Sequence, residues 1–422
     1  LSMDHALKAG RQNAVLRQAC RSCGAAVTDL VADLGLQPPS NHYLPGDATN
    51  IREAKYPLRA VVCGACKLVQ LDTDVAPAEL FKDYAYFSSF SDSWLEHARR
   101  YCAMATERFR LDRSSLVVEL ASNDGYLLRN FAAAGIPVLG IDPSDTVAAA
   151  AERAGVPTLV EFFGKDVADR LAAEGRQADL IIANIVLVHV PELNDFIDGI
   201  VRLLKPTGSA TLEFPHLLRL IQHVEFDTIY HEHYSYFSLG AAARAFARAG
   251  LGIHDVEELP THGGSLRIHV APVAAGRAET PNVARVRAEE ASLEDLATYA
   301  RFARRVEECS ASLKAFFAEA KRSGKTVMGY GAAAKGNTLL NFVGATSADV
   351  AMVADRSPHK QGKLLPGTHI PIVAPERLMA ARPDYILILP WNIKDEIIRQ
   401  LAAARDWGAR FVTAVPLVQV QA

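Results

Sequence analysis

The chain has 422 residues, of which 50% are hydrophobic and 22% are charged. This composition excludes a largely disordered chain, and the length predicts two or three domains. Lysine and arginine number 45 against 48 acidic residues, so the net charge of -3 provides no general basic field for nucleic acid or an anionic membrane. No apolar run reaches the roughly 18 residues of a spanning helix, and the stretch from Leu1 to Gln18 lacks the apolar centre of a signal peptide. We therefore expect a cytoplasmic protein without a nucleic-acid or membrane partner.

Four of the 6 cysteines form two Cys-x-x-Cys pairs near the N-terminus, Cys20/Cys23 and Cys63/Cys66. Both pairs end in a tight turn, and two such knuckles bring four thiolates into a tetrahedron around one ion. A redox Cys-x-x-Cys normally follows a strand of a βαβ unit and needs no second copy. We therefore favour one structural Zn²⁺ over a redox pair or four unrelated buried thiols. Because the protein fills all four positions, a catalytic zinc is not expected.

Two later regions alternate strand-like and helix-like runs. In the first, strands are predicted at 115–120, 138–142, 179–186 and 209–214, with helices at 126–134 and 196–204. In the second, an amphipathic helix over 284–324 precedes strands at 326–330, 348–354, 385–389 and 410–415. Short connections between alternating strands and helices are typical of parallel, doubly wound sheets. We predict an α/β protein with two such domains.

The loop after the first of these strands reads Ala121-Ser122-Asn123-Asp124-Gly125. A dinucleotide-binding fold has Gly-x-Gly-x-x-Gly here, so that pyrophosphate can approach the helix N-terminus. Only Gly125 is present, and Glu119 and Asp124 add negative charge, which disfavours a phosphate and suits a cationic ligand with an amino group. Asp142 ends the second strand, where an acid accepts hydrogen bonds from a ribose hydroxyl pair. Together these features resemble the S-adenosylmethionine site of class I methyltransferases.

That resemblance implies a set of cofactor-binding residues at the ends of the central strands: Glu119, Ser122, Asn123, Gly125, Asp142 and Asn184. Asp142 would anchor the ribose, and His189 lies just beyond the later strand. Ala121 and Asn123 stand where glycines are common in such loops. A plain structural turn is the alternative, since any doubly wound sheet has a glycine turn and a surface acid.

The densest group of titratable side chains lies between Phe226 and Ser238. It contains His231, Glu232 and His233 with tyrosines on both sides. The second histidine follows the glutamate directly, so this is not the His-Glu-x-x-His motif that stacks two zinc ligands on a helix. A buried polar belt is the alternative, but so many groups that move protons favour an active site.

The run Tyr-His-Glu-His-x-Ser-Tyr-Phe-Ser at 230–238, with His-Gly-Gly-Ser-Leu-Arg at 262–267, resembles the sugar C-methyltransferases of deoxysugar pathways. The likeness is to the nucleotide-sugar carbon-3 methyltransferases of the tetronitrose and kijanose type, and it also covers the zinc knuckles and the runs 83–89 and 329–337. It implies that a group of five residues surrounds the reacting sugar: Tyr84, His189, Tyr230, Glu232 and His233. In that family His233 corresponds to the proposed base.

A regular strand would not bring this group together. It would place His231 and His233 on one face and Tyr230 and Glu232 on the other. The segment must therefore be irregular, or only one of its faces is catalytic.

The loop 329–337 follows a predicted strand and should open a helix, so that its backbone N–H groups and Lys335 are offered to an anion. It resembles a Rossmann phosphate turn, but Lys335-Gly336 stands where a dinucleotide fingerprint has its third glycine. We expect it to dock the nucleotide or pyrophosphate of the sugar, with Ser265, Lys335 and Asn337 binding the substrate. An empty structural turn inherited from a nucleotide-binding fold is the alternative.

The predicted architecture is a zinc-binding module over 1–80, a class I methyltransferase (Rossmann-like) domain over 81–283, and a helical connector with a C-terminal Rossmann-like domain over 284–422. The predicted reaction is S-adenosylmethionine-dependent C-methylation of a 4-keto-6-deoxy nucleotide sugar, with a dTDP linkage favoured. The ketone acidifies the neighbouring C–H. His233 removes the proton of this C–H, which produces an enolate. Carbon 3 is favoured; methylation at carbon 5, the nucleotide base and the oligomeric state are left open.

Rival functions remain at this point. An O- or N-methyltransferase of a sugar or another small metabolite would use the same cofactor without needing a ketone. An NAD-linked oxidoreductase would be built on the loop 329–337. A zinc-organised binding scaffold without catalysis is disfavoured by the cluster at 230–236.

Overall fold

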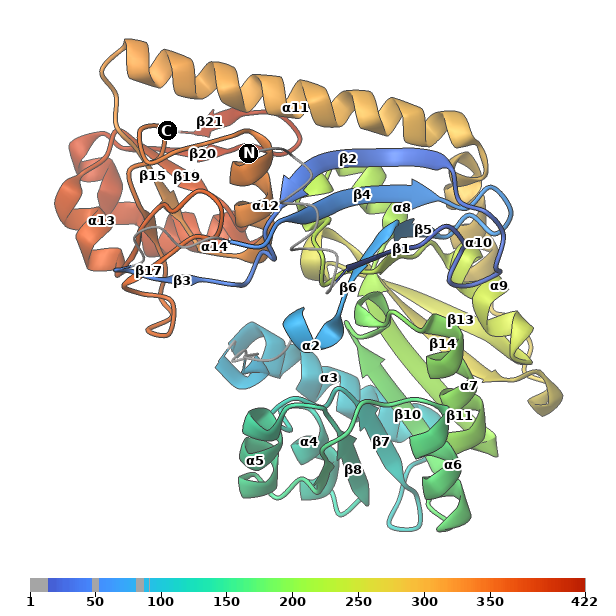
Figure 1. Ribbon diagram of the computed structural model, residues 1–422. Helices are drawn as coiled ribbons and strands as arrows, with labels where there is room; N and C mark the ends of the chain where they lie inside the picture. The colour runs from blue at the N-terminus through green and yellow to red at the C-terminus, as the bar shows by residue number, and fades with distance from the viewer. Residues whose placement is uncertain (1–13, 48–52, 81–86, 91, 422) are drawn as a thin grey trace.

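The computed structural model describes residues 14–47, 53–80, 87–90 and 92–421. Its largest sheet has seven strands in the order β13-β14-β11-β10-β7-β8-β9 (Figure 1). In chain order these are β7 (Val117–Leu120), β8 (Val138–Ile141), β9 (Thr158–Leu159), β10 (Ala178–Asn184), β11 (Leu204–Pro215), β13 (Leu251–Leu259) and β14 (Ser265–Pro272). Every neighbouring pair is parallel except those that β14 makes with β11 and β13. The parallel sheet predicted for the middle of the chain is confirmed.

This sheet is covered by helices on both faces, because alternate residues of a strand point to opposite sides. Ile181 of β10 lies in a core with α6 (Lys165–Ala173), α7 (Leu193–Leu203) and α9 (Leu239–Arg248). Its neighbour Ile182 lies in another core with α3 (Asp92–Phe109), α4 (Leu128–Ala133) and α5 (Asp145–Arg153). The strand order reverses between β7 and β10, and open α/β sheets bind ligands beyond the carboxyl ends of strands at such a reversal.

A second sheet near the C-terminus has the order β18-β16-β15-β19-β20-β21. Its strands are β15 (Val327–Tyr330), β16 (Val353–Ala354), β18 (Ile372–Val373), β19 (Tyr385–Ile388), β20 (Arg410–Thr413) and β21 (Gln419–Gln421), parallel except for the last pair. Three helices accompany them: α12 (Ala334–Phe342), α13 (Pro375–Ala381) and α14 (Lys394–Gln400). The predicted strand over 348–354 is shorter than expected, because the Asp349 carboxylate accepts from the Thr346 N–H at 2.9 Å in a turn that precedes β16.

The N-terminal part forms an antiparallel sheet in the order β12-β5-β4-β2. Strands β2 (Asp29–Gln37), β4 (Tyr56–Val62) and β5 (Val69–Leu71) precede the central domain in the chain, whereas β12 (Ser235–Tyr236) belongs to the His-Glu-His segment. Two further short pairings are β1 (Ala14–Leu16) with β6 (Thr73–Val75) and β3 (Leu44–Pro45) with β17 (Lys363–Leu364). The N-terminal part is therefore hydrogen-bonded to both later parts of the chain.

The long helix α11 (Leu296–Arg322) runs along β2 (Figure 1). Leu34 and Leu58 of the N-terminal sheet share one buried core with Phe302 and Leu313 of this helix and with Val353 of β16. Strands β2 and β4 therefore bury apolar side chains jointly with the C-terminal domain. None of the described helices is both long enough and apolar enough to cross a membrane.

Candidate active site

The four cysteines of the two knuckles converge on one point. Their Sγ atoms all lie within 4.8 Å of one another, and the Cys20–Cys66 and Cys23–Cys63 pairs are each 3.5 Å apart. All four are free of disulfide bonds. Sulfurs held about 2.3 Å from a central ion would be roughly 3.8 Å from one another in a tetrahedron. The cluster therefore fits a structural zinc ion with no position left for a substrate.

Both knuckles close with the same backbone turn. The Cys20 carbonyl accepts from the Gly24 N–H, and the Cys63 carbonyl from the Lys67 N–H, each at 2.9 Å. Gly24 and Lys67 have φ angles of +76° and +61°. This left-handed conformation is open to glycine and strained for lysine. The two motifs are therefore equivalent in shape although their sequences differ at this position.

The loop after β7 follows the course of a glycine-rich turn although it contains a single glycine. Ala121 and Asn123 both have φ angles of +51°, and Gly125 has +75°. A Cβ atom at Gly125 would lie 3.0 Å from Val156 Cγ2. Left-handed backbone costs a non-glycine residue roughly 1–2 kcal/mol. Ala121 and Asn123, which stand where glycines are common, thus adopt the same left-handed backbone that glycines would adopt in this turn.

Asp142 follows β8 and holds this loop in place. Its Oδ2 accepts from the Asn123 N–H at 3.0 Å, and its Oδ1 accepts from the Ser144 N–H at 2.9 Å. Burial raises the pKa of Asp142. Asn184 is buried at the end of β10, on the other side of the strand reversal. The anchoring of a ribose by Asp142 stays a prediction.

Buried polar atoms beside the loop have no hydrogen-bond partner among the described residues: Glu119 Oε2, Ser122 Oγ and Asp124 Oδ1. Burial, followed by the nearby charge of Asp142, raises the pKa of Glu119 well above its ordinary value. An unsatisfied buried polar atom costs roughly 1–3 kcal/mol. A polar, positively charged ligand would satisfy these atoms, so the residues fit S-adenosylmethionine, which carries a sulfonium and an amino group.

The segment 230–233 is a turn and not a strand. The Tyr230 carbonyl accepts from the His233 N–H at 2.9 Å, so His231 and Glu232 occupy the two central positions. The strand β12 begins only at Ser235. The turn brings the rings of Tyr230 and His233 together, with centroids 4.0 Å apart. The expected irregularity of the segment is confirmed. The turn brings Tyr230 next to His233, whereas a strand would have placed Tyr230 and Glu232 on one face.

The two central residues of the turn face the N-terminal module. The His231 ring meets Tyr56 edge-on, with centroids 5.9 Å apart. The Glu232 carboxylate accepts from Asn41 Nδ2 at 3.0 Å and from Ser40 Oγ at 3.2 Å. Burial raises the pKa of Glu232. Glu232 thus fastens the turn to the N-terminal module, and its role toward a substrate stays a prediction.

Backbone carbonyls determine the tautomers of two imidazoles. His233 Nδ1 donates to the Thr228 carbonyl at 2.9 Å, and His189 Nδ1 donates to the Glu232 carbonyl at 2.7 Å. Because a carbonyl only accepts, Nδ1 carries the proton and Nε2 is the basic nitrogen of each ring. The ring centroids lie 4.8 Å apart. Burial lowers the pKa of His189 to about 4, and burial followed by the charge of His189 lowers that of His233 well below 6.5.

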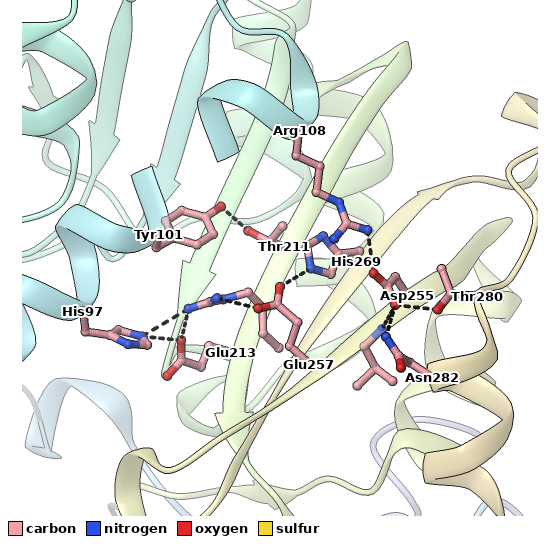
Figure 2. Close-up of polar contacts among 12 residues, drawn as sticks. His97, Tyr101, Arg108, Thr211, Glu213, Asp255, Glu257, His269, Thr280 and Asn282 are labelled. Atoms are coloured by element: carbon pink, nitrogen blue, oxygen red, sulfur yellow. Dashed lines mark hydrogen bonds and ion pairs between the residues drawn. The ribbon is translucent and has the colours of Figure 1, made fainter. Parts of the chain in front are cut away.

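Helix α3 contributes a buried polar cluster that our sequence analysis missed. Glu213, near the end of β11, accepts from His97 Nε2 at 2.8 Å and from Arg267 at 2.9 Å. Figure 2 shows the His97 and Glu213 side chains facing each other. The Arg267 guanidinium lies 4.6 Å from the centre of the Tyr101 ring. Thr261 Oγ1 donates to the second Glu213 oxygen at 2.9 Å. The sequence signal for the ion pair was a charged residue within each of two apolar strands, Glu213 in β11 and Arg267 in β14.

The loop after β15 repeats the geometry of the loop after β7. Gly331 has a φ angle of +89°. The Asp355 carboxylate, just after β16, accepts from the Ala332 N–H at 2.7 Å and from the Ser357 N–H at 2.8 Å. Asp142 makes the same two kinds of contact in the central domain. The C-terminal domain therefore contains a second turn of the nucleotide-binding type.

Lys335, which was expected to meet a phosphate, has partners within the chain. Its Nζ donates to Asn392 Oδ1 at 2.8 Å and lies 4.5 Å from the centre of the Trp391 ring. Burial lowers the pKa of Lys335, and the charges of Asp227 and Glu225 oppose that effect. Trp391 Nε1 donates to Asp227 Oδ2 at 2.7 Å. An anion would have to compete with these groups, and its binding by Lys335 stays a prediction.

The remaining predicted substrate residues lie in supporting positions. Ser265 Oγ donates to the Thr261 carbonyl at 3.0 Å. Asn337 is buried in α12, where its carbonyl accepts from Asn341 Nδ2 at 2.9 Å. The structure gives neither residue a contact with His233. Tyr84 lies outside the described residues.

Family models match three consecutive parts of the chain. A zinc binding domain matches residues 20–81, a methyltransferase domain matches 94–256, and a C-methyltransferase C-terminal domain matches 260–416. The first match contains all four clustered cysteines, the second contains β7 to β11, and the third contains the C-terminal sheet up to β20.

Two relatives and one solved structure illustrate the similarity. The C-methyltransferase NovU of Streptomyces niveus is 36% identical over 399 residues, which cover 94% of this chain and 95% of that protein. The ubiquinone biosynthesis O-methyltransferase of Bartonella tribocorum is 30% identical over 93 residues, 22% of this chain and 38% of that protein. The magnesium protoporphyrin IX methyltransferase of Synechocystis PCC 6803, with bound SAH, is 17% identical with a TM-score of 0.34 and covers 42% of this chain and 82% of that one. The last likeness is too weak to support an inference.

Similarity to NovU extends over nearly the full length of both proteins. The methyltransferase domain match coincides with the central sheet and with the unsatisfied polar atoms around its first loop, so the cofactor is S-adenosylmethionine. The zinc binding domain match coincides with the four-cysteine cluster, so the metal is zinc. The chain belongs to the S-adenosylmethionine-dependent C-methyltransferases.

Proposed function

We propose that the chain methylates carbon 3, next to the ketone, of a 4-keto-6-deoxy nucleotide sugar that is dTDP-linked. The motifs at 230–238 and 262–267 support this proposal through their resemblance to sugar C-methyltransferases, as does the C-methyltransferase activity named for NovU. The observation that carries it is the state of His233: a neutral imidazole, held by Thr228 so that Nε2 is basic, with the Tyr230 ring beside it.

The ketone makes the carbon reactive. A saturated carbon is a poor nucleophile, but a C–H next to a ketone is acidic enough for a positioned base to remove its proton. His233 Nε2 takes that proton. The C–H electron pair forms a carbon–carbon double bond, and the carbonyl π electrons move to the oxygen, which becomes negatively charged.

Glu119, Asp142 and Asn184, with the turn Ser122–Gly125, would hold S-adenosylmethionine, which would supply an electrophilic methyl group for the enolate carbon and leave as S-adenosylhomocysteine. The Tyr230 hydroxyl polarises the ketone, and His233 later releases its proton to solvent. Glu232, His189 and Tyr84 complete the acceptor site. The nucleotide docks at the loop 329–337 through Lys335 and Asn337, and Ser265 also binds the substrate.

The test is mass spectrometry of products after incubation with labelled S-adenosylmethionine and a panel of 4-keto-6-deoxy sugars linked to dTDP, UDP or GDP. The dTDP-linked ketone should gain one methyl group on carbon, located by fragmentation. The matched 4-hydroxy sugar should gain none, because it cannot form the enolate.

Methylation of the 4-hydroxy sugar on oxygen or nitrogen would contradict the enolate reaction. Methylation at carbon 5 would move the site of proton removal to the other side of the same ketone. Absence of product from every ketone in the panel would overturn the nucleotide-sugar substrate.

A further inference from the structure

The loop at 262–264 has an unusual backbone. His262, Gly263 and Gly264 have φ angles of +55°, +92° and +130°. A Cβ atom at Gly263 would lie 2.6 Å from Glu225 Oε1 and 2.8 Å from Trp391 Cη2. Crowding and positive φ angles therefore explain why glycine occupies positions 263 and 264. His262 has the same kind of backbone, which costs a residue with a side chain roughly 1–2 kcal/mol. Strained residues persist where the surrounding structure holds them, and they cluster at active sites and ligand-binding sites.

The imidazole of His262 lies between the cofactor loop and the C-terminal loop. On one side it meets Trp94 edge-on, with centroids 5.7 Å apart, and Trp94 in turn stacks on Tyr126, which follows Gly125. On the other side, Gly263 abuts the Trp391 ring, over which Lys335 is placed. His262 is exposed, and its ring has no hydrogen bond to any of the described residues.

The charges around the site reach this ring as well. Loss of water around the ring next to its neighbours, followed by the charge of Lys335, lowers the pKa of His262. His262 in turn contributes to the low pKa of His233, after burial and His189. Both pKa shifts favour the neutral imidazole at neutral pH, and the charge of Lys335 acts on both rings.

The loop does not need the imidazole for its shape. Thr261 Oγ1 is held by Glu213 at 2.9 Å, and the Thr261 carbonyl accepts from Ser265 Oγ at 3.0 Å. The Gly264 N–H donates to the same carbonyl at 2.9 Å. These hydrogen bonds stabilise the loop through Thr261. They do not involve the His262 ring, which can therefore contact a ligand.

We propose that His262 is a further catalytic residue, which donates a hydrogen bond to the ketone oxygen of the methyl acceptor as that oxygen gains negative charge. The inference rests on the proposed function. When His233 Nε2 takes the proton from carbon, the carbonyl π electrons move to oxygen, and the N–H of neutral His262 meets that charge; no proton is transferred from His262. A base with a pKa as low as that of His233 is weak, so its reaction depends on stabilising the enolate oxygen.

The test compares His262→Gly with His369→Gly in the zinc-loaded 422-residue protein. His369 is a matched control, because it is an exposed histidine with a φ angle of +56° whose ring contacts Glu53, away from the loop. Glycine accepts both backbone conformations, so neither variant should lose stability through strain.

For His262→Gly we expect kcat to fall by about 10²- to 10³-fold, the usual effect of removing one oxyanion donor. Deuterium exchange next to the ketone, measured by mass spectrometry with S-adenosylhomocysteine present, should fall in parallel. Affinity for S-adenosylmethionine and the melting temperature should be kept, and added imidazole should restore part of the rate. His369→Gly should keep the wild-type rate and gain nothing from imidazole.

A His262→Gly variant with near-normal kcat, or one in which only KM rises, would overturn the donor role while the proposed function stands. If the wild type methylates no 4-keto nucleotide sugar, the proposed function fails and this inference fails with it. Should His262→Gly not fold, His262→Ala gives the same readouts, since alanine has no side-chain donor and already occupies the left-handed backbone at position 121.

Discussion

Thr228 decides how His233 can react. Its carbonyl accepts from Nδ1 at 2.9 Å, which leaves Nε2 as the basic nitrogen. Burial and the neighbouring His189 keep the ring neutral, so no proton has to leave before catalysis begins. The rate should therefore stay independent of His233 titration throughout the neutral range, in contrast to an exposed histidine with a pKa near 6.5.

Replacement of His233 by alanine removes the proposed base. We expect turnover and deuterium exchange next to the ketone both to fall by about a hundred- to ten-thousand-fold. Binding of S-adenosylmethionine, measured by calorimetry, should be unchanged, and His359→Ala on the exposed surface should behave as wild type. Near-normal turnover in His233→Ala would assign the base to another residue, with His189 and Tyr84 the next to test.

Glu225 is the residue through which pH should act on stability. Burial, followed by the charge of Asp227, raises its pKa from 4.5 to about 8. The folded chain thus keeps a proton that the unfolded chain releases, and the free energy of unfolding falls as the pH rises from 4.5 to 8. The loss is at most about 1.4 kcal/mol per pH unit from this group.

Glu225→Gln removes this loss because glutamine does not ionise. The melting temperature of the variant relative to wild type should rise between pH 5 and pH 8 and then stay constant. Glu307→Gln, an exposed change on α11, should follow the wild type at every pH. A constant difference between Glu225→Gln and wild type over the whole range would show that Glu225 is ionised in the folded protein.

Among the elements, α3 is attached to the central sheet by polar as well as apolar contacts. Figure 2 shows His97, Tyr101 and Arg108 of this helix facing polar side chains of the strands. Tyr101 and Thr211 share a hydrogen bond of 2.5 Å, and Arg108 pairs with Asp255 at 2.6 Å. Buried pairs of this kind contribute little net stability when complete, but the loss of one partner leaves a charge without compensation.

Arg267→Ala should therefore lower the free energy of unfolding by about 3–5 kcal/mol, because it leaves the fully buried Glu213 carboxylate without its cation. Urea denaturation measures the change. Arg285→Ala, which breaks exposed pairs with Glu258 and Glu289, should cost less than about 1 kcal/mol. Equal effects of the two substitutions would mean that Glu213 is protonated in the folded protein.

The sequence predicted those elements whose apolar pattern is local. The strands of the two parallel sheets have runs that identify them, although β16 is shorter than expected. The strand β12 has two residues, too few for a periodic pattern, and its partner β5 lies more than a hundred residues earlier in the chain. Pairing at that distance is decided by the packing of the whole molecule.

The candidate site was predictable to a similar extent. The zinc cysteines follow from their spacing, and the cofactor site follows from the strand ends, because both signals are local. The separation of Tyr230 and His233 from His231 and Glu232 depends on a turn that residue types do not specify. Glu213 and His262 were missed as participants because their partners come from other elements. The ribose role of Asp142, the domain limits at 80 and 283 and the cytoplasmic location stay predictions.

At the scale of the whole molecule, the zinc-binding module supports the segment that carries the proposed base, although it does not contain that segment. Strand β5 pairs with β12, and Ser40 and Asn41 hold Glu232. Loss of zinc should thus reduce activity although the metal meets no substrate.

Metal analysis of the purified protein should find about one zinc per chain, and Cys63→Ser should lose it together with several degrees of melting temperature. Turnover should fall further than affinity for S-adenosylmethionine, since the cofactor loop belongs to the central sheet. A zinc-free protein of unchanged melting temperature and turnover would contradict the structural role of the metal.

The shared core of the N-terminal sheet and α11 has a consequence for co-translational folding. Strands β2 and β4 emerge early, but their apolar partners Phe302 and Leu313 follow more than two hundred residues later. Synthesis adds roughly 5–20 residues per second. The apolar faces of these strands therefore stay exposed for on the order of ten to fifty seconds before their partners in α11 are made. The central domain can complete its own two cores during that interval. Nascent chains that end before α11 should therefore recruit chaperones at their N-terminal strands, and the chain should reach its final form only after synthesis is nearly complete.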